Sequence, residues 1–197
     1  ALERLLDELP SYLDELAQLL TENEIVLIRT KNTGRLPLEK AIAGSASGPV
    51  LRGSGLAWDL RKADPYDAYD QVEFQVPVGI NGDNYDRFWI RMEEMRQSII
   101  IVRQCLAQIE PGPVGLNLPL VLRAPAGAEA YAHVESPKGE LGFYLVSDGG
   151  ISPYRCKIRS PSLINLTVLR DMLIGSKLAD MIVTFGSIDV NLGEVDR

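Results

Sequence analysis

Apolar residues recur at helical spacing through the first twenty positions of the chain. Leucines stand at positions 2, 5, 6, 9, 13, 16, 19 and 20, with acidic residues between them. A repeat of three to four residues gives one apolar face and predicts an amphipathic helix over 2–20. Pro10 lies inside this pattern, where it either kinks the helix or starts a second one.

The longest predicted helix runs from 84 to 109, with Asp83 as its N-cap. Arg87, Arg91 and Glu94 lie at positions i, i+4 and i+7 of this helix, a spacing typical of a solvated or ion-paired face. Its apolar positions follow alternating steps of four and three, which is typical of core packing. They are Phe88, Met92, Met95, Ile99, Val102, Leu106 and Ile109.

Several short apolar segments predict strands. EIVLIRT (24–30) and VEFQVPV (72–78) each predict one strand, and Pro77 places the second at a sheet edge or strand end. Three further strands are expected in series, and turn residues between them predict an antiparallel meander. These strands cover residues 129–135, 141–147 and 154–160.

The remaining pattern completes an α+β fold: an N-terminal helix, one long central helix, a three- to four-stranded antiparallel meander and two closing helices. The closing helices are expected at 162–173 and 177–187, and a short one at 37–43. The Pro/Gly-rich connector 111–127 is expected to lie along a surface. We treat 1–197 as a single domain. Because the chain opens on Ala1 inside a helical pattern, we expect it to be the C-terminal part of a larger subunit.

Composition and charge narrow the function. The chain is 46% hydrophobic and 24% charged, as expected for a globular protein with a core. A net charge of −7 without a Lys/Arg stripe argues against nucleic-acid binding. No run of 18 apolar residues predicts a membrane span, and no signal peptide is evident. Cys105 and Cys156 are far apart; we expect reduced, buried thiols, with a disulfide as the alternative.

Common catalytic and metal-binding motifs are missing from the sequence. His133 is the only histidine, and no acid or thiol stands at a motif spacing from it, so we expect a structural or surface residue without a catalytic role. One histidine and two isolated cysteines disfavour a zinc site, and we predict no metal ligands. Neither a GxGxxG nor a Walker sequence is present.

Two charged stretches carry the candidate chemistry. LRGSGLAWDLRKADPYDAYD (51–70) suits a buried ion-pair network or a partner interface, with the lining of an active site as the alternative. Its candidate residues are Arg52, Asp59, Arg61, Lys62 and Tyr66.

The second stretch is a charged hairpin with Glu135, Lys138 and Glu140 near its turn, followed by a cationic strand. In that strand Arg155, Lys157 and Arg159 alternate on one face. A solvated sheet face explains this pattern, and so does a surface that meets an acidic partner or an anionic group.

Several long motifs, in one order, resemble a known family. RGSGLAWDLRKADPYDAYD, DRFWIRMEEMRQSIIIVRQ, ESPKGELGFYLVSDGGISPYRCKIRSPS and the terminal GSIDVNLGEVDR are similar to the C-terminal half of the large quinone-site subunit of respiratory complex I. The resemblance covers the chain from about residue 1 to its end. It implies part of a fold shared with the large subunit of nickel–iron hydrogenases. Their metal-binding cysteines are missing from this tail, which argues against hydrogenase activity.

The resemblance assigns roles in the tail. It implies that Asp189 stands where a metal-binding cysteine once stood and faces a quinone cavity, with Val195 close by. A carboxylate there could relay protons. Arg197 could pair with Asp196, with Asp189 or with another buried acid. From the residues alone, Asp189 is instead expected to be an ordinary acid at a helix end.

The resemblance also implies a function and partners. The expected function is part of the quinone site of a proton-translocating NADH–quinone oxidoreductase, inactive as an isolated chain. Quinone is the implied substrate, and flavin and iron–sulfur clusters lie on partner subunits. The implied partners are the iron–sulfur subunit, the adjacent small peripheral-arm subunit and a membrane-arm subunit, on the cytoplasmic side of the cell membrane and peripheral to it. Alternatives are a non-catalytic scaffold or interface subunit and an energy-converting hydrogenase large subunit.

Overall fold

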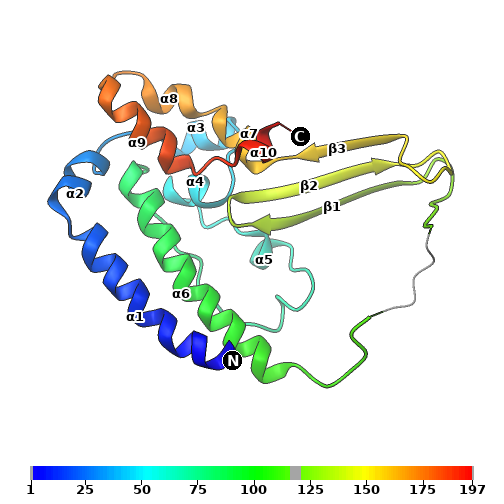
Figure 1. Ribbon diagram of the computed structural model, residues 1–197. Coiled ribbons are helices and arrows are strands. Elements are labelled where there is room, and N and C mark those ends of the chain that lie inside the picture. Colours follow the sequence, from blue (N-terminus) through cyan, green and yellow to red (C-terminus); the bar gives the residue numbers. More distant parts are fainter. Residues whose placement is uncertain (1, 116–120, 197) are drawn as a thin grey trace.

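The computed structural model describes residues 2–115 and 121–196 and confirms an α+β fold (Figure 1). Helices come first along the chain, a three-stranded sheet follows, and short helices close it. In order, the elements are α1 (Leu2–Thr21), α2 (Glu24–Thr30), α3 (Leu38–Ala43), α4 (Gly48–Gly53), α5 (Leu60–Ala63), α6 (Asn84–Gln108), β1 (Glu129–Ser136), β2 (Gly139–Val146), β3 (Arg155–Arg159), α7 (Pro161–Leu166), α8 (Leu169–Leu173), α9 (Leu178–Ile188) and α10 (Leu192–Val195).

The two long helices α1 and α6 lie side by side (Figure 1). α1 is one helix with Pro10 inside it, and its Leu6 and Leu13 are buried. The predicted N-cap of α6 is confirmed, because Asp83 accepts a hydrogen bond from the Asp86 backbone N–H at 2.9 Å. The apolar stripe of α6 is only partly core: Met92 is buried, but Met95 is 40% exposed.

The predicted meander is confirmed as an antiparallel sheet of order β1-β2-β3. Its first hairpin turns on Pro137 and Lys138, because Ser136 pairs with Gly139. The register places Arg155, Lys157 and Arg159 on one face, as the alternation predicted. This sheet projects from the helices as an arm (Figure 1).

Two strand predictions were wrong. Residues 24–30 form helix α2, because Asn23 caps this short apolar run through bonds to the Ile25 and Val26 backbone N–H groups. Residues 72–78 form no helix or strand and belong to no sheet. Side chains of α6 take the place of a neighbouring strand: Gln104 and Gln97 accept hydrogen bonds from the backbone N–H groups of Glu73 and Gln75.

Two other expectations need correction. The single helix predicted over 162–173 is divided into α7 and α8 at Thr167 and Val168, where the Thr167 hydroxyl bonds to the carbonyls of Gly44 and Ile164. Both cysteines are free and exposed rather than buried, because Cys105 and Cys156 lie on outward faces of α6 and β3. The described parts of the connector, 111–115 and 121–127, are exposed. The expected path along a surface was wrong for 111–115, because Val114 is fully exposed and a Cβ on Gly112 or Gly115 would meet nothing within 4 Å.

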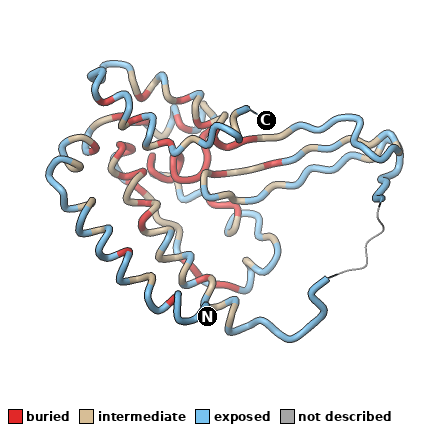
Figure 2. Tube along the Cα trace, viewed as in Figure 1, coloured by how far each residue is buried: buried red, intermediate tan, exposed pale blue. Residues whose placement is uncertain are grey.

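The main core lies where the short helices meet one end of the sheet. Figure 2 shows buried positions gathered there, whereas the sheet arm is largely exposed. The buried members are Leu36, Ala41, Ala46, Val50, Leu51, Val168, Met172 and Ile188. Because Ile188 ends α9 and Val50 lies in α4, this core fixes the positions of both helices. No helix within 2–115 or 121–196 combines the length and apolar character that crossing a membrane requires.

A close backbone contact fixes the hairpin against α4. Gly48 and Gly139 have φ angles of 63° and 130°, both in the region that favours glycine. A Cβ on Gly48 would lie 2.5 Å from the Gly139 Cα, so neither position has room for a side chain. Asn165 of α7 joins the same contact by donating to the carbonyls of Ser47 and Lys138 at 3.3 and 3.2 Å.

Candidate functional site

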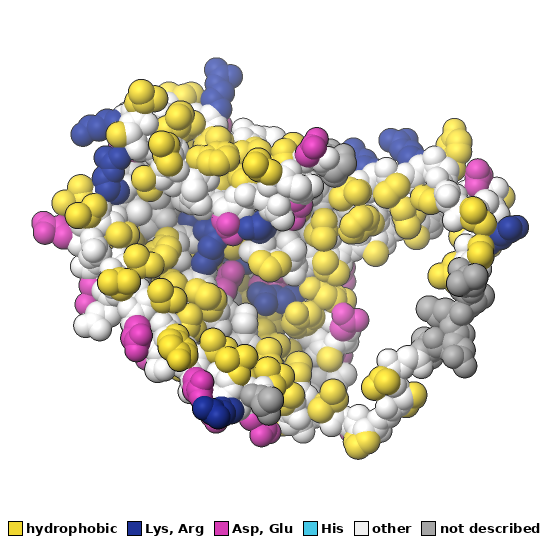
Figure 3. All heavy atoms as spheres, viewed as in Figure 1, with side chains coloured by type: hydrophobic (Ala, Val, Ile, Leu, Met, Phe, Trp, Pro, Cys, Tyr) yellow, Lys and Arg dark blue, Asp and Glu magenta, His cyan; other side chains and the backbone are white. Residues whose placement is uncertain are grey.

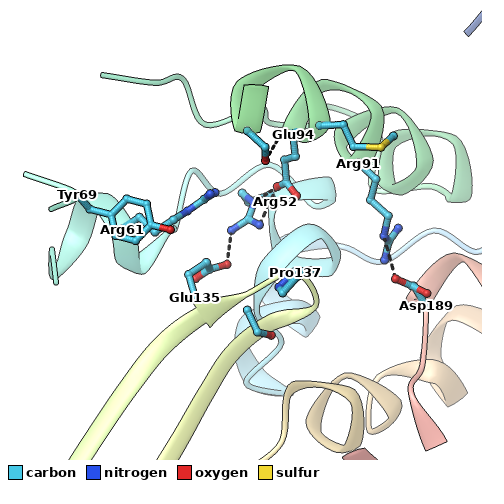
Figure 4. Close-up of a pocket in the computed structure, with 11 residues that line it drawn as sticks. Arg52, Arg61, Tyr69, Arg91, Glu94, Glu135, Pro137 and Asp189 are labelled. Carbon is cyan, nitrogen blue, oxygen red and sulfur yellow. Dashed lines mark hydrogen bonds and ion pairs between the residues drawn. The ribbon is translucent and has the colours of Figure 1, made fainter. Parts of the chain in front are cut away.

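A buried guanidinium links α4, α6 and β1 (Figure 4). Arg52 of α4 is 1% exposed. Its Nε and Nη2 lie 2.8 and 2.7 Å from Oε1 of Glu94, and its Nη1 lies 2.8 Å from Oε1 of Glu135. Asp59 stands 3.6 Å away as a third carboxylate. The predicted buried ion-pair network is therefore present.

The pKa values of two acids in this network are shifted in opposite directions. Burial raises the pKa of Glu94, although the charge of Arg52 opposes the shift. Burial also acts to raise the pKa of Asp59, but hydrogen bonds from Arg61 and the charge of Arg52 outweigh it, so that pKa is lowered. The pKa of Arg52 is raised, because Glu94 and Glu135 more than offset its burial. Of these two acids, Glu94 is the one that more readily takes up a proton.

The segment after α4 is fastened to the hairpin by the same cluster. Asp59 caps α5 and binds Arg61 through both oxygens, at 2.9 and 2.6 Å. Glu135 accepts from the backbone N–H of Leu60 at 3.2 Å, and its own N–H donates to the Tyr66 hydroxyl at 3.1 Å. These contacts hold the segment 59–66 against the hairpin.

Arg87 is a second buried guanidinium, and it connects α6 with α9 and two loops. It donates to the Ser187 hydroxyl at 2.9 Å, to the carbonyls of Gly82 and Gly34, and to the Asn84 side chain. Burial lowers its pKa to about 10. Arg87, Arg91 and Glu94 all point into the protein, so this face of the helix is not solvated. The ion-paired alternative is confirmed for Glu94, which pairs with Arg52, and for Arg91, which pairs with Asp189.

Arg91 and Asp189 meet at the end of α9, where Figure 4 shows Arg91 extending from α6 toward Asp189. Arg91 Nε lies 3.8 Å from Oδ2 of Asp189, and Nζ of Lys138 lies 2.6 Å from the same oxygen. Asp189 is the C-cap of α9 and has the left-handed backbone conformation, with φ 62°. The two cations beside its carboxylate come from α6 and from the hairpin turn.

A cavity of about 620 Å³ lies between these groups, within the range of small-molecule sites. Figure 3 shows acidic and basic side chains in the middle of one face, with hydrophobic side chains around them. The cavity is lined by Arg52, Arg61, Tyr69, Arg91, Glu94, Met95, Ser98, Glu135, Ser136, Pro137 and Asp189. A second cavity of about 410 Å³ shares Arg91 and Asp189 with it.

Six of the fourteen sequence-predicted residues line the large cavity: Arg52, Arg61, Arg91, Glu94, Glu135 and Asp189. Asp59, Tyr66 and Lys138 contact members of this group.

The remaining predicted residues lie around or apart from this cavity. Lys62 stacks on the Phe74 ring, with Nζ 4.4 Å from its centroid. Arg155 is exposed on β3. Val195 is half-buried in α10, which packs against α7. Arg197 lies outside the described residues, so its predicted pairing does too.

Sequence reasoning missed the partners of His133. Its Nε2 lies 2.9 Å from Asp64 and its Nδ1 lies 3.1 Å from Glu140, and these contacts raise the pKa of the imidazole. Glu140 also accepts from the Tyr131 hydroxyl and lies 3.5 Å from Arg159. His133 and Glu140 are diagonal neighbours across the hairpin, so a correct register would have paired them. No sequence signal points to Asp64.

The described ranges, 2–115 and 121–196, hold no group of three His, Cys, Asp or Glu residues arranged for a metal ion. The side chains around the larger cavity can donate hydrogen bonds to an acceptor oxygen through guanidinium groups and can hold a proton on a carboxylate.

Comparison with known proteins places the chain in a family. The family described as "Respiratory-chain NADH dehydrogenase, 49 Kd subunit" matches residues 1–122 and 117–197. An NADH-quinone oxidoreductase subunit of Dehalococcoides mccartyi is 54% identical over 197 residues, which is all of this chain and 53% of that protein. Subunits of the same enzyme from Herpetosiphon aurantiacus and Roseiflexus sp. are 55% identical over 200 residues and 52% identical over 204. Each of these two matches covers all of this chain and 54% of the relative.

The chain spans about half the length of the curated relatives that it matches. The family match and these identities nevertheless cover the whole of it. The chain therefore belongs to the family of the 49 kDa subunit of the respiratory-chain NADH dehydrogenase.

Proposed function

We propose that this chain forms part of the quinone-reaction site of a proton-translocating NADH–quinone oxidoreductase. The observation that carries the proposal is the charged cavity between α4, α6, the hairpin turn and the end of α9. Its volume suits a quinone head group, and its lining combines guanidinium groups with an acid, Glu94, whose pKa is raised by burial. The names of the relatives supply the class of reaction.

The reaction sets what the lining must do. Reduction of a quinone to a quinol takes up two electrons and two protons, and negative charge develops on the ring oxygens between these steps. Guanidinium groups such as that of Arg91 would stabilise this charge, and Glu94 or Asp189 would hold a proton for transfer. In this proposal the electrons come from an iron–sulfur cluster on a partner subunit, and the flavin and the NADH site also lie on other subunits.

Partners and location are part of the same proposal. The face of the sheet with Arg155 and Lys157 would meet neighbouring subunits of the complex, among them the iron–sulfur subunit, the small peripheral-arm subunit and a membrane-arm subunit. The assembly would place this chain on the cytoplasmic side of the membrane, peripheral to it. The exposed sheet arm, which packs on little else in the described chain, supports this assignment (Figure 2).

Photoaffinity labelling tests the proposal directly. Membranes that contain the assembled complex are illuminated with a photoreactive azidoquinone, and labelled peptides are identified by mass spectrometry. We expect label on peptides that contain residues 91–98 or 135–138, and we expect excess unlabelled quinone to remove it. Label confined to other subunits, or label on this chain that unlabelled quinone leaves in place, would contradict the proposal.

A specific observation favours a second function, that of a scaffold. Asp59 and Arg61 bond chiefly to each other and lie beside Arg52, so their charges are used within the fold. If the cluster serves only assembly, Arg61→Ala or Asp59→Ala reduces the amount of assembled complex, and the complex that remains has an unaltered apparent KM for quinone.

A further inference from the structure

The two cavities meet at one pair of residues. Arg91 and Asp189 line both of them. The larger cavity is bordered by Arg52, Glu94 and Glu135 and is strongly charged. The smaller one contains no charged residue beyond the shared pair, and apolar side chains from α2, α6 and α9 line much of it, namely Val26, Phe88 and Val183. A ligand with a polar head and an apolar tail therefore matches the two cavities together, with its head beside the shared pair.

Arg91 differs from the two most deeply buried guanidinium groups, those of Arg52 and Arg87. Arg52 directs all three of its nitrogens to acceptors, and so does Arg87. Arg91 directs Nη1 and Nη2 to the carbonyls of Arg87 and Ile188, at 2.8 and 3.0 Å. Its Nε is a buried donor that has no hydrogen-bond partner among the described residues. Leaving such a buried donor without an acceptor is energetically unfavourable, so an acceptor supplied by a ligand would be bound favourably here.

Lys138 explains why Asp189 does not satisfy this donor. Both cations face the same oxygen, Oδ2, but Lys138 Nζ lies 2.6 Å from it and Arg91 Nε lies 3.8 Å from it. A separation of 3.8 Å is too long for a hydrogen bond. The hairpin turn that carries Lys138 is fixed by the contact between Gly48 and Gly139, so the carboxylate is held on the hairpin side.

We propose that Arg91 is a ligand-binding residue whose Nε–H donates to an oxygen of the quinone head group at the junction of the two cavities, and that Lys138 keeps this donor free by holding Asp189. The inference rests on the proposed function and assigns its ligand a position. The polar ring lies in the larger cavity beside Arg91, and the substituent runs over the smaller, more apolar one. Lys138 acts as a positioning residue, since it acts through Asp189 rather than on the ligand.

The test uses the full-length protein in the assembled complex, with a decyl-substituted benzoquinone as the acceptor. Arg91→Lys keeps the positive charge but removes the Nε donor. We expect the apparent KM to rise about tenfold, which corresponds to about 1.4 kcal/mol. NADH oxidation by an artificial acceptor that takes electrons ahead of the quinone site should not change. The matched control is Arg96→Lys on the same helix, where the native side chain pairs with Asp14 near the surface.

A second variant leaves Arg91 and its backbone hydrogen bonds intact. In Lys138→Gln the Asp189 carboxylate is free to move toward Arg91 Nε and to compete with the ligand, so we expect the apparent KM to rise severalfold. Lys138→Arg retains the cation and should restore a near-native KM. A purely structural role for Lys138 would lower the amount of complex without moving KM.

The outcomes separate this inference from the function on which it rests. An unchanged KM in Lys138→Gln overturns the inference, and so does an unchanged KM in Arg91→Lys if that variant assembles. If Arg91→Lys does not assemble, Lys138→Gln alone decides. Suppose that this chain is photolabelled, that unlabelled quinone removes the label, and that KM is nevertheless unchanged in the variants. The quinone site would then stand, and only the role of Arg91 would fail. If this chain carries no photolabel that unlabelled quinone can remove, the proposed function itself fails.

Discussion

Arg52 and Glu135 join helix α4 to the first strand of the sheet through an ion pair that is almost completely shielded from water. Arg52 Nη1 lies 2.8 Å from Glu135 Oε1, and the two side chains are 1% and 3% exposed. Burying two charges is costly unless each is paired and hydrogen-bonded. Here Glu94 and the carbonyl of Trp58 take the remaining donors of Arg52, so the guanidinium organises the wall of the cavity.

Arg52→Met should therefore destabilise the fold strongly. Methionine fills similar volume, but Asp59, Glu94 and Glu135 are left close together without their shared cation. Loss of one partner from a buried ion pair costs about 3–5 kcal/mol. Thermal and urea unfolding, followed by circular dichroism, measure the change in free energy of unfolding. Arg103→Met is the matched control, because Arg103 pairs with Asp7 at the surface; it should change stability by less than about 0.5 kcal/mol. A loss below about 1 kcal/mol in Arg52→Met would contradict a central role for this residue.

Gly139→Ala tests the contact between the hairpin and α4. A Cβ at this position would lie 2.4 Å from the Ser47 hydroxyl oxygen and 2.9 Å from the Ser47 carbonyl carbon, and φ is 130°. Strain of this kind costs about 1–3 kcal/mol before any clash is counted. We expect a lower midpoint of thermal unfolding and faster proteolysis near residue 138. Gly112→Ala, where an added Cβ meets nothing within 4 Å, should behave like the unaltered chain. Equal stability of the two variants would show that the hairpin is not fixed here.

The stability contributed by His133 should depend on pH. Contacts with Asp64 and Glu140 raise its pKa, and Tyr131 and Arg159 also contact Glu140. A group with a raised folded pKa contributes its full stability below the unfolded pKa, about 6.5, and loses it as pH rises through the folded pKa. His133→Gln should thus destabilise the chain more at pH 5.5 than at pH 9. Because the imidazole is 26% exposed, we expect a difference below about 1 kcal/mol. Equal effects of the substitution at both pH values would mean that the pair of acids does not hold the charged form.

The sequence predicted those parts of the fold that depend on local signals. The Asp83 cap, the spacing in α6 and the turn residues between the strands predicted the long helix and the meander closely. The segments 24–30 and 72–78 were misassigned because short apolar runs fit either a strand or a helix. Their conformation depends on tertiary contacts, such as the side chains of Gln97 and Gln104 that hold 72–78 against α6.

The same distinction between local signals and tertiary contacts decides which parts of the candidate site could be predicted. The dense mixed charge of 51–70 indicated a buried ion-pair network or a partner interface, and the structure shows that Arg52, Asp59 and Arg61 belong to such a network. The partners of Asp189 were not predictable from spacing. Lys138 is brought to it by the hairpin turn, and Arg91 by the packing of α6 on α9, across separations of 51 and 98 positions in the sequence. Contacts of this range are set by the assembled fold rather than by a local pattern.

Asp189→Asn should separate proton handling from ligand binding. Asparagine accepts the left-handed backbone conformation at this position, with φ 62°, so the end of α9 should keep its shape and the complex should assemble. The amide cannot carry a proton to a reduced quinone, and a side chain that supports general acid–base transfer contributes about 10²–10⁴-fold to a rate. We therefore expect the maximal rate of quinone reduction to fall tenfold or more. The apparent KM should not rise, because a neutral amide attracts Arg91 less than a carboxylate does. Steady-state kinetics on membranes, normalised to the amount of assembled complex, measure both quantities. Loss of assembly would instead make Asp189 structural, and a raised KM with an unaltered rate would place it in binding alone.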